Sequence, residues 1–266
     1  MRDDKSEDRE LLIERDSVDP NIEILTLNRP EARNALTYSL YDQLEAAVRQ
    51  TTARCLVITG TDPAFCSGDD VKSIMAGPSG PPSDRLERTP RLTPAAEALL
   101  YSDVPTIAAI NGAAVGWGME LALMADLRVA SERAKLGELF ILRGLVSDVP
   151  GIGRLASVVG REKAAEMLFT GDVIDAEEAL RIGLVGRVVA HEQLLPEALR
   201  LARKIAANPP LAITRMKRGL RETLDPDWHD LGRWVSSNLA ELFRTEDHRE
   251  GVASFLEKRP AVYRGR

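Results

Sequence analysis

The feature that most constrains the fold is a strand-like run that leads through a glycine-rich turn into a short apolar helix. Residues 104–130 read "VPTIAAINGAAVGWGMELALMADLRVA", which predicts a strand, a turn, a helix and a further strand in that order. Parallel strands need a crossover connection of this kind, usually a helix. The segment therefore favours an α/β fold.

The same alternation of strand and helix is found on both sides of this segment. Residues 22–30 alternate apolar and polar side chains and stop at Pro30, which predicts a strand. A helix is predicted after Thr37 as N-cap, with apolar residues at four-residue spacing: Leu40, Leu44 and Val48. A buried strand is predicted at 54–60, and Asp175 with Glu178 forms a capping-box pattern before a later helix and strand.

Three regions are expected along the 266 residues. Residues 1–20 read as a charged N-terminal tail, and residues 21–192 as the α/β core that holds the site. Residues 193–266 carry only helical patterns, separated by prolines, and are expected to form a C-terminal helical oligomerisation region. Residues 76–91 are rich in Pro, Gly, Ser and charge, which predicts a loop that shapes the pocket.

Charge and cysteine content exclude several classes of function. The net charge is −6, from 35 basic and 41 acidic residues, so no nucleic-acid partner is expected. The two cysteines, Cys55 and Cys66, cannot build a disulfide framework, and no cluster has the spacing of a metal site. The charged N-terminus lacks an apolar core, so no signal peptide and no membrane partner are expected. We expect a cytoplasmic protein with no bound metal.

The stretch "PAFCSGDDV" at 63–71 raises the question of a nucleophile. Ser67 does not lie in a G-x-S-x-G turn, and no histidine lies in a glycine-rich turn where it could act as base. Cys66 is better explained as a small buried side chain. A nucleophilic role for either residue is disfavoured.

A second glycine motif, "GIGRLA" at 151–156, fits the loose dinucleotide pattern. The residues before it include Asp148 and Pro150 and do not form a β-branched strand. A tight helix start is therefore the better interpretation of this motif.

The remaining candidate is the backbone itself. Turns between a strand and a helix leave amides without intrahelical partners, and two such turns can aim two N–H groups at one oxygen. A carboxylate beside such an oxyanion hole, here Glu120 or Asp148, could move a proton next to a polarised carbonyl. The alternative is that both are ordinary caps or dipole partners, as most acidic residues near helix starts are.

Several motifs together resemble the crotonase family, the enoyl-CoA hydratases and isomerases. They occur in order from Ile22 onward: "LNRPEARNAL" (27–36), "AFCSGDDV" (64–71), "AINGAAVGWGMELALMADLRVA" (109–130), "TGDVIDAEEALRIGLVGRVV" (170–189) and "EDHREGVASFLEKRPAVYRGR" (246–266). The resemblance implies a spiral of ββα repeats. It also implies C-terminal helices that assemble a homotrimer or a dimer of trimers.

The resemblance also implies roles for particular residues. The two oxyanion-hole amides fall on Ser67 and Trp117, and the first hydratase glutamate falls on Glu120. The second glutamate position holds Phe140, while Asp148 falls where the dienoyl-CoA isomerases have a catalytic aspartate. The remaining residues expected at the substrate or its coenzyme A moiety are Arg29, Ala32, Arg33, Ala35, Gly68, Asp69, Asp70 and Gly116.

We therefore expect an enzyme that isomerises or hydrates an unsaturated acyl-CoA, with Glu120 and Asp148 as acid/base groups. Coenzyme A is part of that substrate, and no separate cofactor is expected. Two alternatives are an acyl-CoA hydrolase or decarboxylase of the same fold, and a catalytically weak acyl-CoA-binding protein.

Overall fold

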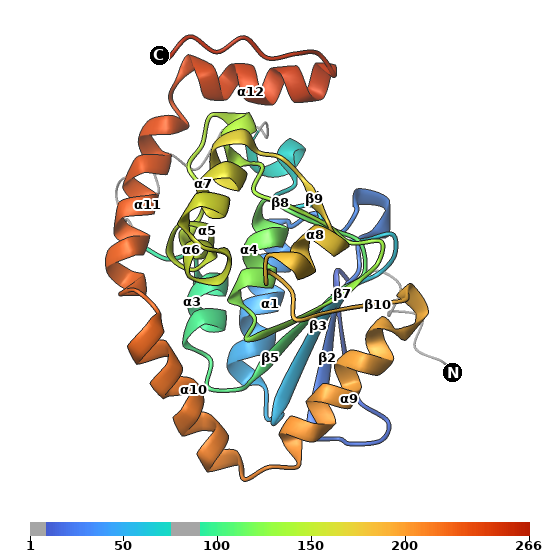
Figure 1. Cartoon of the computed structure of the whole chain (residues 1–266). Coiled ribbons are helices and arrows are strands. Elements are labelled where there is room, and N and C mark those ends of the chain that lie inside the picture. The colour runs from blue at the N-terminus through green and yellow to red at the C-terminus, as the bar shows by residue number, and fades with distance from the viewer. Residues whose placement is uncertain (1–8, 76–90) are drawn as a thin grey trace.

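The computed structural model describes residues 9–75 and 91–266 and contains two sheets (Figure 1). The larger has six strands in the order β1-β2-β3-β5-β7-β10 and the smaller has four in the order β4-β6-β8-β9. The bounds of the first set are β1 (Leu11–Arg15), β2 (Ile22–Leu27), β3 (Cys55–Gly60), β5 (Thr106–Ile110), β7 (Leu127–Ser131) and β10 (Arg187–Val189). Those of the second are β4 (Ala64–Cys66), β6 (Ala113–Val115), β8 (Lys135–Gly137) and β9 (Ile174–Asp175).

The two strands of each consecutive pair lie in different sheets. β3, β5 and β7 lie in the large sheet in parallel, and the strands that follow them, β4, β6 and β8, lie parallel in the small one. Each pair is followed by helical structure, so the chain repeats a ββα unit. The α/β fold with ββα repeats predicted from the sequence is confirmed.

Helices cover both faces of the large sheet. α1 (Tyr38–Gln50), α3 (Pro94–Tyr101) and α4 (Trp117–Met124) share the main core with inward residues such as Leu56 and Ile58. α9 (Leu194–Ala206) packs on the opposite face against the alternate residues, such as Val57 and Ile107. A sheet buried on both faces explains why its strands read as nearly continuous apolar runs.

The predicted caps and apolar stripe of the first helix are confirmed. The Thr37 side chain accepts a hydrogen bond from the Leu40 amide (3.0 Å), and Leu40, Leu44 and Val48 are buried. The Asp175 side chain likewise accepts from the Glu178 amide (2.9 Å). This places α8 (Ala176–Arg181) where the capping pattern predicted a helix.

Further short helices follow the strand pairs. They are α5 (Val149–Gly153), α6 (Leu155–Val159) and α7 (Arg161–Thr170), with 3-10 turns at Pro30–Ala32, Phe140–Arg143 and His191–Gln193 and a π-helical turn at Val71–Met75. The "GIGRLA" motif lies across α5 and α6, and Asp148 caps α5. The prediction of a helix start at this motif is confirmed.

Two boundaries differ from those expected. Residues 11–15 of the expected tail form β1, which pairs antiparallel with β2, because Leu11 is an apolar anchor that the surrounding charges concealed. The helical region from 193 contributes α9 to the core through Leu194, Ala198 and Ala202. α10 (Pro210–Leu224), α11 (Trp228–Leu242) and α12 (Glu246–Glu257) run along the outside (Figure 1), and α11 also adds Trp228 and Val235 to the main core.

The loop predicted at 76–91 falls almost wholly outside the described residues, which resume at Arg91. Among the helices that the structure describes, none combines the length and apolar content required to cross a membrane.

Candidate active site

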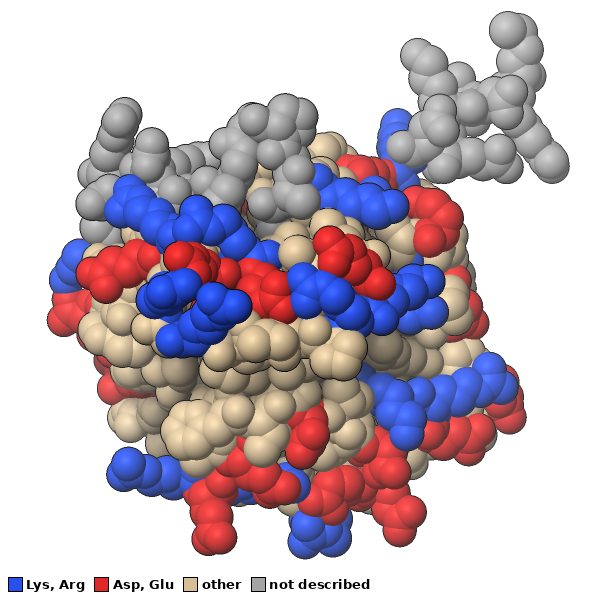
Figure 2. Space-filling model, turned by 90° about the horizontal axis from the view of Figure 1, so that it is seen from above, with Lys and Arg blue, Asp and Glu red and all other residues tan. Residues whose placement is uncertain are grey.

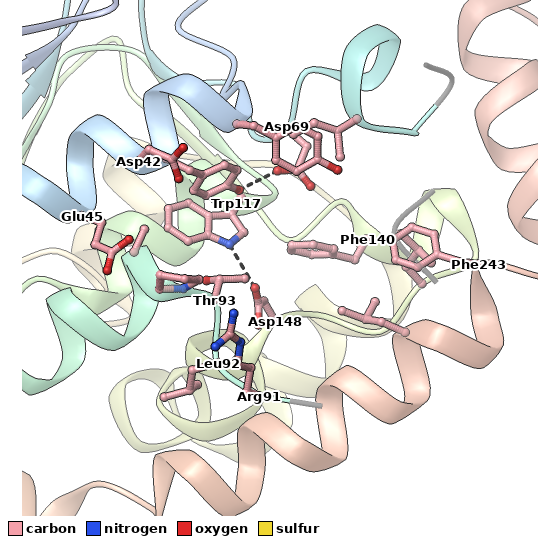
Figure 3. Close-up of a pocket in the computed structure, with 17 residues that line it drawn as sticks. Asp42, Glu45, Asp69, Arg91, Leu92, Thr93, Trp117, Phe140, Asp148 and Phe243 are labelled. Atoms are coloured by element: carbon pink, nitrogen blue, oxygen red, sulfur yellow. Dashed lines mark hydrogen bonds between the residues drawn. The ribbon is translucent and has the colours of Figure 1, made fainter. Parts of the chain in front are cut away.

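A cavity of about 230 Å³ lies between α1, α4 and α11 (Figure 3). Its lining is mainly aromatic and apolar, with carboxylates at several points. The lining includes Tyr41, Asp69, Trp117, Phe140, Asp148, Leu239 and Phe243. Leu239 belongs to α11 and Phe243 follows it, so the C-terminal region contributes to the site that the sequence analysis assigned to residues 21–192.

Two glycine turns meet at the edge of this cavity. Gly68 has a φ of 85°, and a Cβ added to it would lie 2.9 Å from the Val115 carbonyl oxygen and 3.2 Å from the Trp117 nitrogen. Gly116, with a φ of 54°, precedes the first residue of α4, Trp117. The turn after β4 and the N-terminus of α4 therefore touch through their backbones, as the sequence argument required of two amide-bearing turns.

The amide of Ser67 is not available for an oxyanion hole, and the prediction for this residue is wrong. Its N–H donates to the Arg33 carbonyl (3.1 Å) and its hydroxyl donates to the Ala32 carbonyl (3.2 Å). The physical reason is that residues 33–36 run beside residues 67–70, where the Leu36 amide also donates to the Gly68 carbonyl (2.8 Å). Cys66 is fully buried, in agreement with its expected packing role.

The amides of Asp69 and Trp117, at the contact of the two turns, have no hydrogen-bond partner within the described residues. The neighbouring Asp70 amide donates to the Leu36 carbonyl (2.9 Å), but the Asp69 amide has no hydrogen-bond partner among residues 9–75 and 91–266. The Trp117 amide has none within the same residues, because the first intrahelical bonds to Gly116 come from Met119 and Glu120. The free pair at the contact is therefore Asp69 and Trp117.

We predict that Gly68→Ala damages this contact. A left-handed backbone costs a residue with a Cβ about 1–2 kcal/mol, and the added carbon meets the Val115 carbonyl at 2.9 Å. Chemical unfolding should show a loss of that size, and turnover should fall by at least about tenfold because the Asp69 amide moves. Gly160→Ala is the matched control, since Gly160 has a similar φ of 81° but an added Cβ there meets nothing within 4 Å, so turnover should be kept. Full activity in Gly68→Ala would contradict the requirement for a glycine.

Asp148 is half-buried and lines the cavity beside Trp117 (Figure 3). One carboxylate oxygen accepts from the Val149 amide (2.8 Å) and the other accepts from the Trp117 indole N–H (3.0 Å). Burial raises the pKa of this carboxyl above its ordinary value, opposed by these two hydrogen bonds. Asp148 is thus a carboxylate with a fixed orientation and an increased affinity for a proton.

Glu120 does not line the cavity, which differs from the prediction that it faces the substrate. It is fully buried behind the wall, where Oε2 accepts from the Gly151 amide (2.7 Å) and Oε1 lies 2.8 Å from the Ser147 hydroxyl. Burial first, and then the neighbouring Glu138 and Asp148 charges, hold the pKa of Glu120 well above its usual range. Both oxygens are engaged by residues at the start of α5.

Glu138 completes this buried group. Its Oε2 lies 2.7 Å from the same Ser147 hydroxyl, and burial raises its pKa to about 8. A hydroxyl carries one proton and can donate only once, so one of the two carboxyl contacts must be donated by a carboxylic acid. At least one of Glu120 and Glu138 is therefore protonated in the folded protein.

The residues expected along the coenzyme A moiety form a structural cluster. Arg29 makes ion pairs with Glu10 (3.0 Å) and Asp70 (3.1 Å) and also donates to the Ala35 carbonyl (2.6 Å). None of Arg29, Ala32, Arg33 and Ala35 lines the cavity. Arg33 has an exposed side chain, whereas Arg29 is tied down by its partners. On the face seen in Figure 2, basic side chains alternate with acidic ones and do not form a single patch.

Tyr41 is a site residue that the sequence analysis missed. Its hydroxyl donates to Asp69 Oδ1 (2.6 Å), and its ring packs edge-on against Trp117 with centroids 4.6 Å apart. Four cavity residues of α1 recur at the spacing i, i+3, i+4, i+7: Tyr38, Tyr41, Asp42 and Glu45. This polar and aromatic stripe beside the apolar one was the signal available in the sequence.

Comparison with known proteins agrees with this fold. Residues 18–266 match the family model described as enoyl-CoA hydratase/isomerase, and the chain belongs to that family. The solved structure of a carnitinyl-CoA hydratase from Mycobacterium avium superposes with a TM-score of 0.82 at 34% identity, covering 97% of this chain and 99% of the other.

The names of two further relatives describe different reactions. A crotonyl-CoA hydratase of Syntrophomonas wolfei is 35% identical, covering 90% of this chain and 93% of the relative. A 1,2-epoxyphenylacetyl-CoA isomerase of Escherichia coli is 34% identical, covering 94% and 97% respectively. The two sequence identities, 35% and 34%, are nearly equal, so they do not indicate whether this chain catalyses hydration or isomerisation.

Proposed function

We propose that this enzyme shifts a double bond in an unsaturated acyl-CoA thioester by proton transfer through an enolate. The observation that carries the proposal is the Asp148 carboxylate, which lines the cavity beside the unpaired amides of Asp69 and Trp117. Such a group can remove a proton from a carbon next to a carbonyl that the amides polarise. The substrate class comes from the family, since its relatives act on acyl-CoA thioesters.

In this proposal the amides of Asp69 and Trp117 stabilise the thioester oxygen as negative charge develops on it. Main-chain donors suit this role because the two touching turns fix their direction before the substrate binds. Each donor contributes about 3 kcal/mol to the transition state in comparable oxyanion holes. The Trp117 side chain has a second task, since its indole N–H orients Asp148.

Isomerisation is favoured over hydration because the cavity presents few groups that could activate water. Phe140 lines the wall at the position of the second hydratase glutamate, and Glu138 is turned away toward Ser147. Glu120 is likewise behind the wall. This leaves Asp148 and Asp69 as the carboxylates near the contact of the two turns, in a setting suited to moving a proton between carbons.

The coenzyme A moiety is proposed to extend from the amide pair past residues 32–35, with the exposed Arg33 available to its phosphates. We also propose a trimeric assembly through the C-terminal helices. α10 has no buried residue and exposes large apolar side chains: Leu211, Met216, Leu220 and Leu224.

Exchange and turnover of three substrates in deuterated water test the proposed function. We expect a 3-enoyl-CoA or a 3,5-dienoyl-CoA to isomerise with deuterium uptake, and crotonyl-CoA to be hydrated more slowly. Rapid hydration of crotonyl-CoA would make the enzyme a hydratase instead. Release of free coenzyme A would support the hydrolase alternative, and binding without exchange would support the binding-protein alternative.

A further inference from the structure

The cavity holds a second oriented carboxyl group besides Asp148. Asp69 is half-buried and lines the cavity, and its Oδ1 accepts a hydrogen bond of 2.6 Å from the Tyr41 hydroxyl. The Tyr41 ring packs edge-on against Trp117, whose indole N–H holds Asp148. Figure 3 shows Asp69 and Asp148 on either side of the Trp117 indole. The two carboxyls are thus held by two packed aromatic residues.

We propose that the Asp69 side chain, oriented by Tyr41, is a second proton-transfer residue that works with Asp148 on the same substrate. The proposal rests on the proposed function, because it divides the two proton transfers of one isomerisation between two residues. It also narrows the substrate class to an acyl-CoA whose proton is lost at one carbon and gained at another, such as a 3-enoyl-CoA. Asp69 contributes its amide and its carboxyl to different tasks.

The protons balance as follows. Asp148 as carboxylate takes a proton from C2, the C–H electron pair forms the enolate, and the charge moves to the thioester oxygen. The acid form of Asp69 then donates its proton to C4 as the enolate collapses to the 2-enoyl product. At the end of the reaction Asp148 is protonated and Asp69 is a carboxylate. Both return to their starting protonation states by proton exchange with water after product release.

The environment of Asp69 fits this role. Burial raises the pKa of Asp69 to about 6, and the charges of Asp148 and Asp70 add to the effect while the Tyr41 hydroxyl opposes it. Tyr41 itself stays protonated, since burial raises its pKa well above its ordinary value. The groups that face Asp69 are Tyr41 from α1, Asp148 from the start of α5, and Asp70 and Cys66 from its own segment. Asp69 is therefore available as an acid near pH 6.

The test is Asp69→Asn with a 3-enoyl-CoA in deuterated water, with product formation and α-deuterium followed separately by mass spectrometry. Asparagine keeps the backbone amide and the shape but cannot donate an acid proton. We expect isomerisation to fall about 100-fold while exchange at C2 stays within about threefold of wild type. Asp172→Asn, an exposed aspartate outside the site, is the matched control and should retain both rates.

Tyr41→Phe supplies a readout that a merely structural role would not change. Loss of the hydroxyl removes a bond that favours the charged form of Asp69, so the pKa of Asp69 should rise. The fall of turnover with increasing pH, expected from about pH 6 upward in wild type, should then move to higher pH.

Three results overturn the inference. The first is a rate of isomerisation in Asp69→Asn equal to that of wild type. The second is an equal fall in the rates of C2 exchange and isomerisation in that variant. The third is a pH profile of turnover in Tyr41→Phe that is the same as in wild type. Absence of exchange in the wild-type enzyme itself would instead overturn the proposed function.

Discussion

Asp148→Asn is expected to lower turnover of an isomerised acyl-CoA by about 10²–10⁴-fold, the usual contribution of a general acid or base. Asparagine can still cap α5, as asparagine and aspartate are equally good N-caps. It must choose between the Val149 amide and the Trp117 indole as donors to its single oxygen, which costs about 1 kcal/mol of stability. The variant should still fold, so the fall in turnover will reflect the loss of proton transfer by Asp148.

Glu120→Gln is the informative partner of that variant. The glutamine oxygen can accept from the Gly151 amide, and its NH₂ can donate to Ser147, which can then donate to Glu138. We expect turnover within about threefold of wild type, since the group does not line the cavity. The pair is measured by steady-state kinetics and by α-proton exchange. If Glu120→Gln removes activity and Asp148→Asn spares it, the assignment of the base is reversed.

The fold could be predicted from the sequence because the core strands follow the simplest pattern. Residues 55–58 and 107–110 are apolar and buried on both sides, as strands of a parallel sheet with two covered faces must be. β1 was missed because its alternation is half hidden: only Leu11 is fully buried, and Glu14 and Arg15 face solvent. An edge strand of this kind looks like a charged tail until its partner β2 is known.

The site was predicted less completely, because the sequence does not show which residue of each turn faces the cavity. The sequence shows that two glycine turns lie between strands and helices, but not which amide of each turn remains free. The choice between Ser67 and Asp69 depends on residues 33–36, which run beside the turn and occupy the Ser67 amide. The choice between Glu120 and Asp148 depends in the same way on the direction of side chains at the start of α4 and α5. Such choices depend on contacts between distant segments and not on local pattern.

The buried pair of Glu120 and Glu138 should make the enzyme lose stability as the pH rises from about 5 to about 8. An unfolded glutamate releases its proton near pH 4.5, whereas folded Glu138 keeps its proton up to a pKa of about 8. Between these values the folded state binds more protons, so its stability is greatest at low pH and falls as the pH rises. The expected loss is on the order of 3 kcal/mol for this group.

Glu138→Gln should remove this part of the pH dependence, because a glutamine can donate to Ser147 at every pH. Urea unfolding is measured at one protein concentration at pH 5.5, 7 and 8.5. The free energy of unfolding should fall with pH more steeply for wild type than for the variant, and the difference between the two slopes should approach the value for one bound proton. Glu162→Gln, at an exposed position in the first turn of α7, is the matched control and should keep the wild-type slope. Parallel curves for wild type and Glu138→Gln would mean that Glu138 is ionised in the folded protein. The proton required by Ser147 would then belong to Glu120, whose carboxyl would be the neutral partner beside the start of α5.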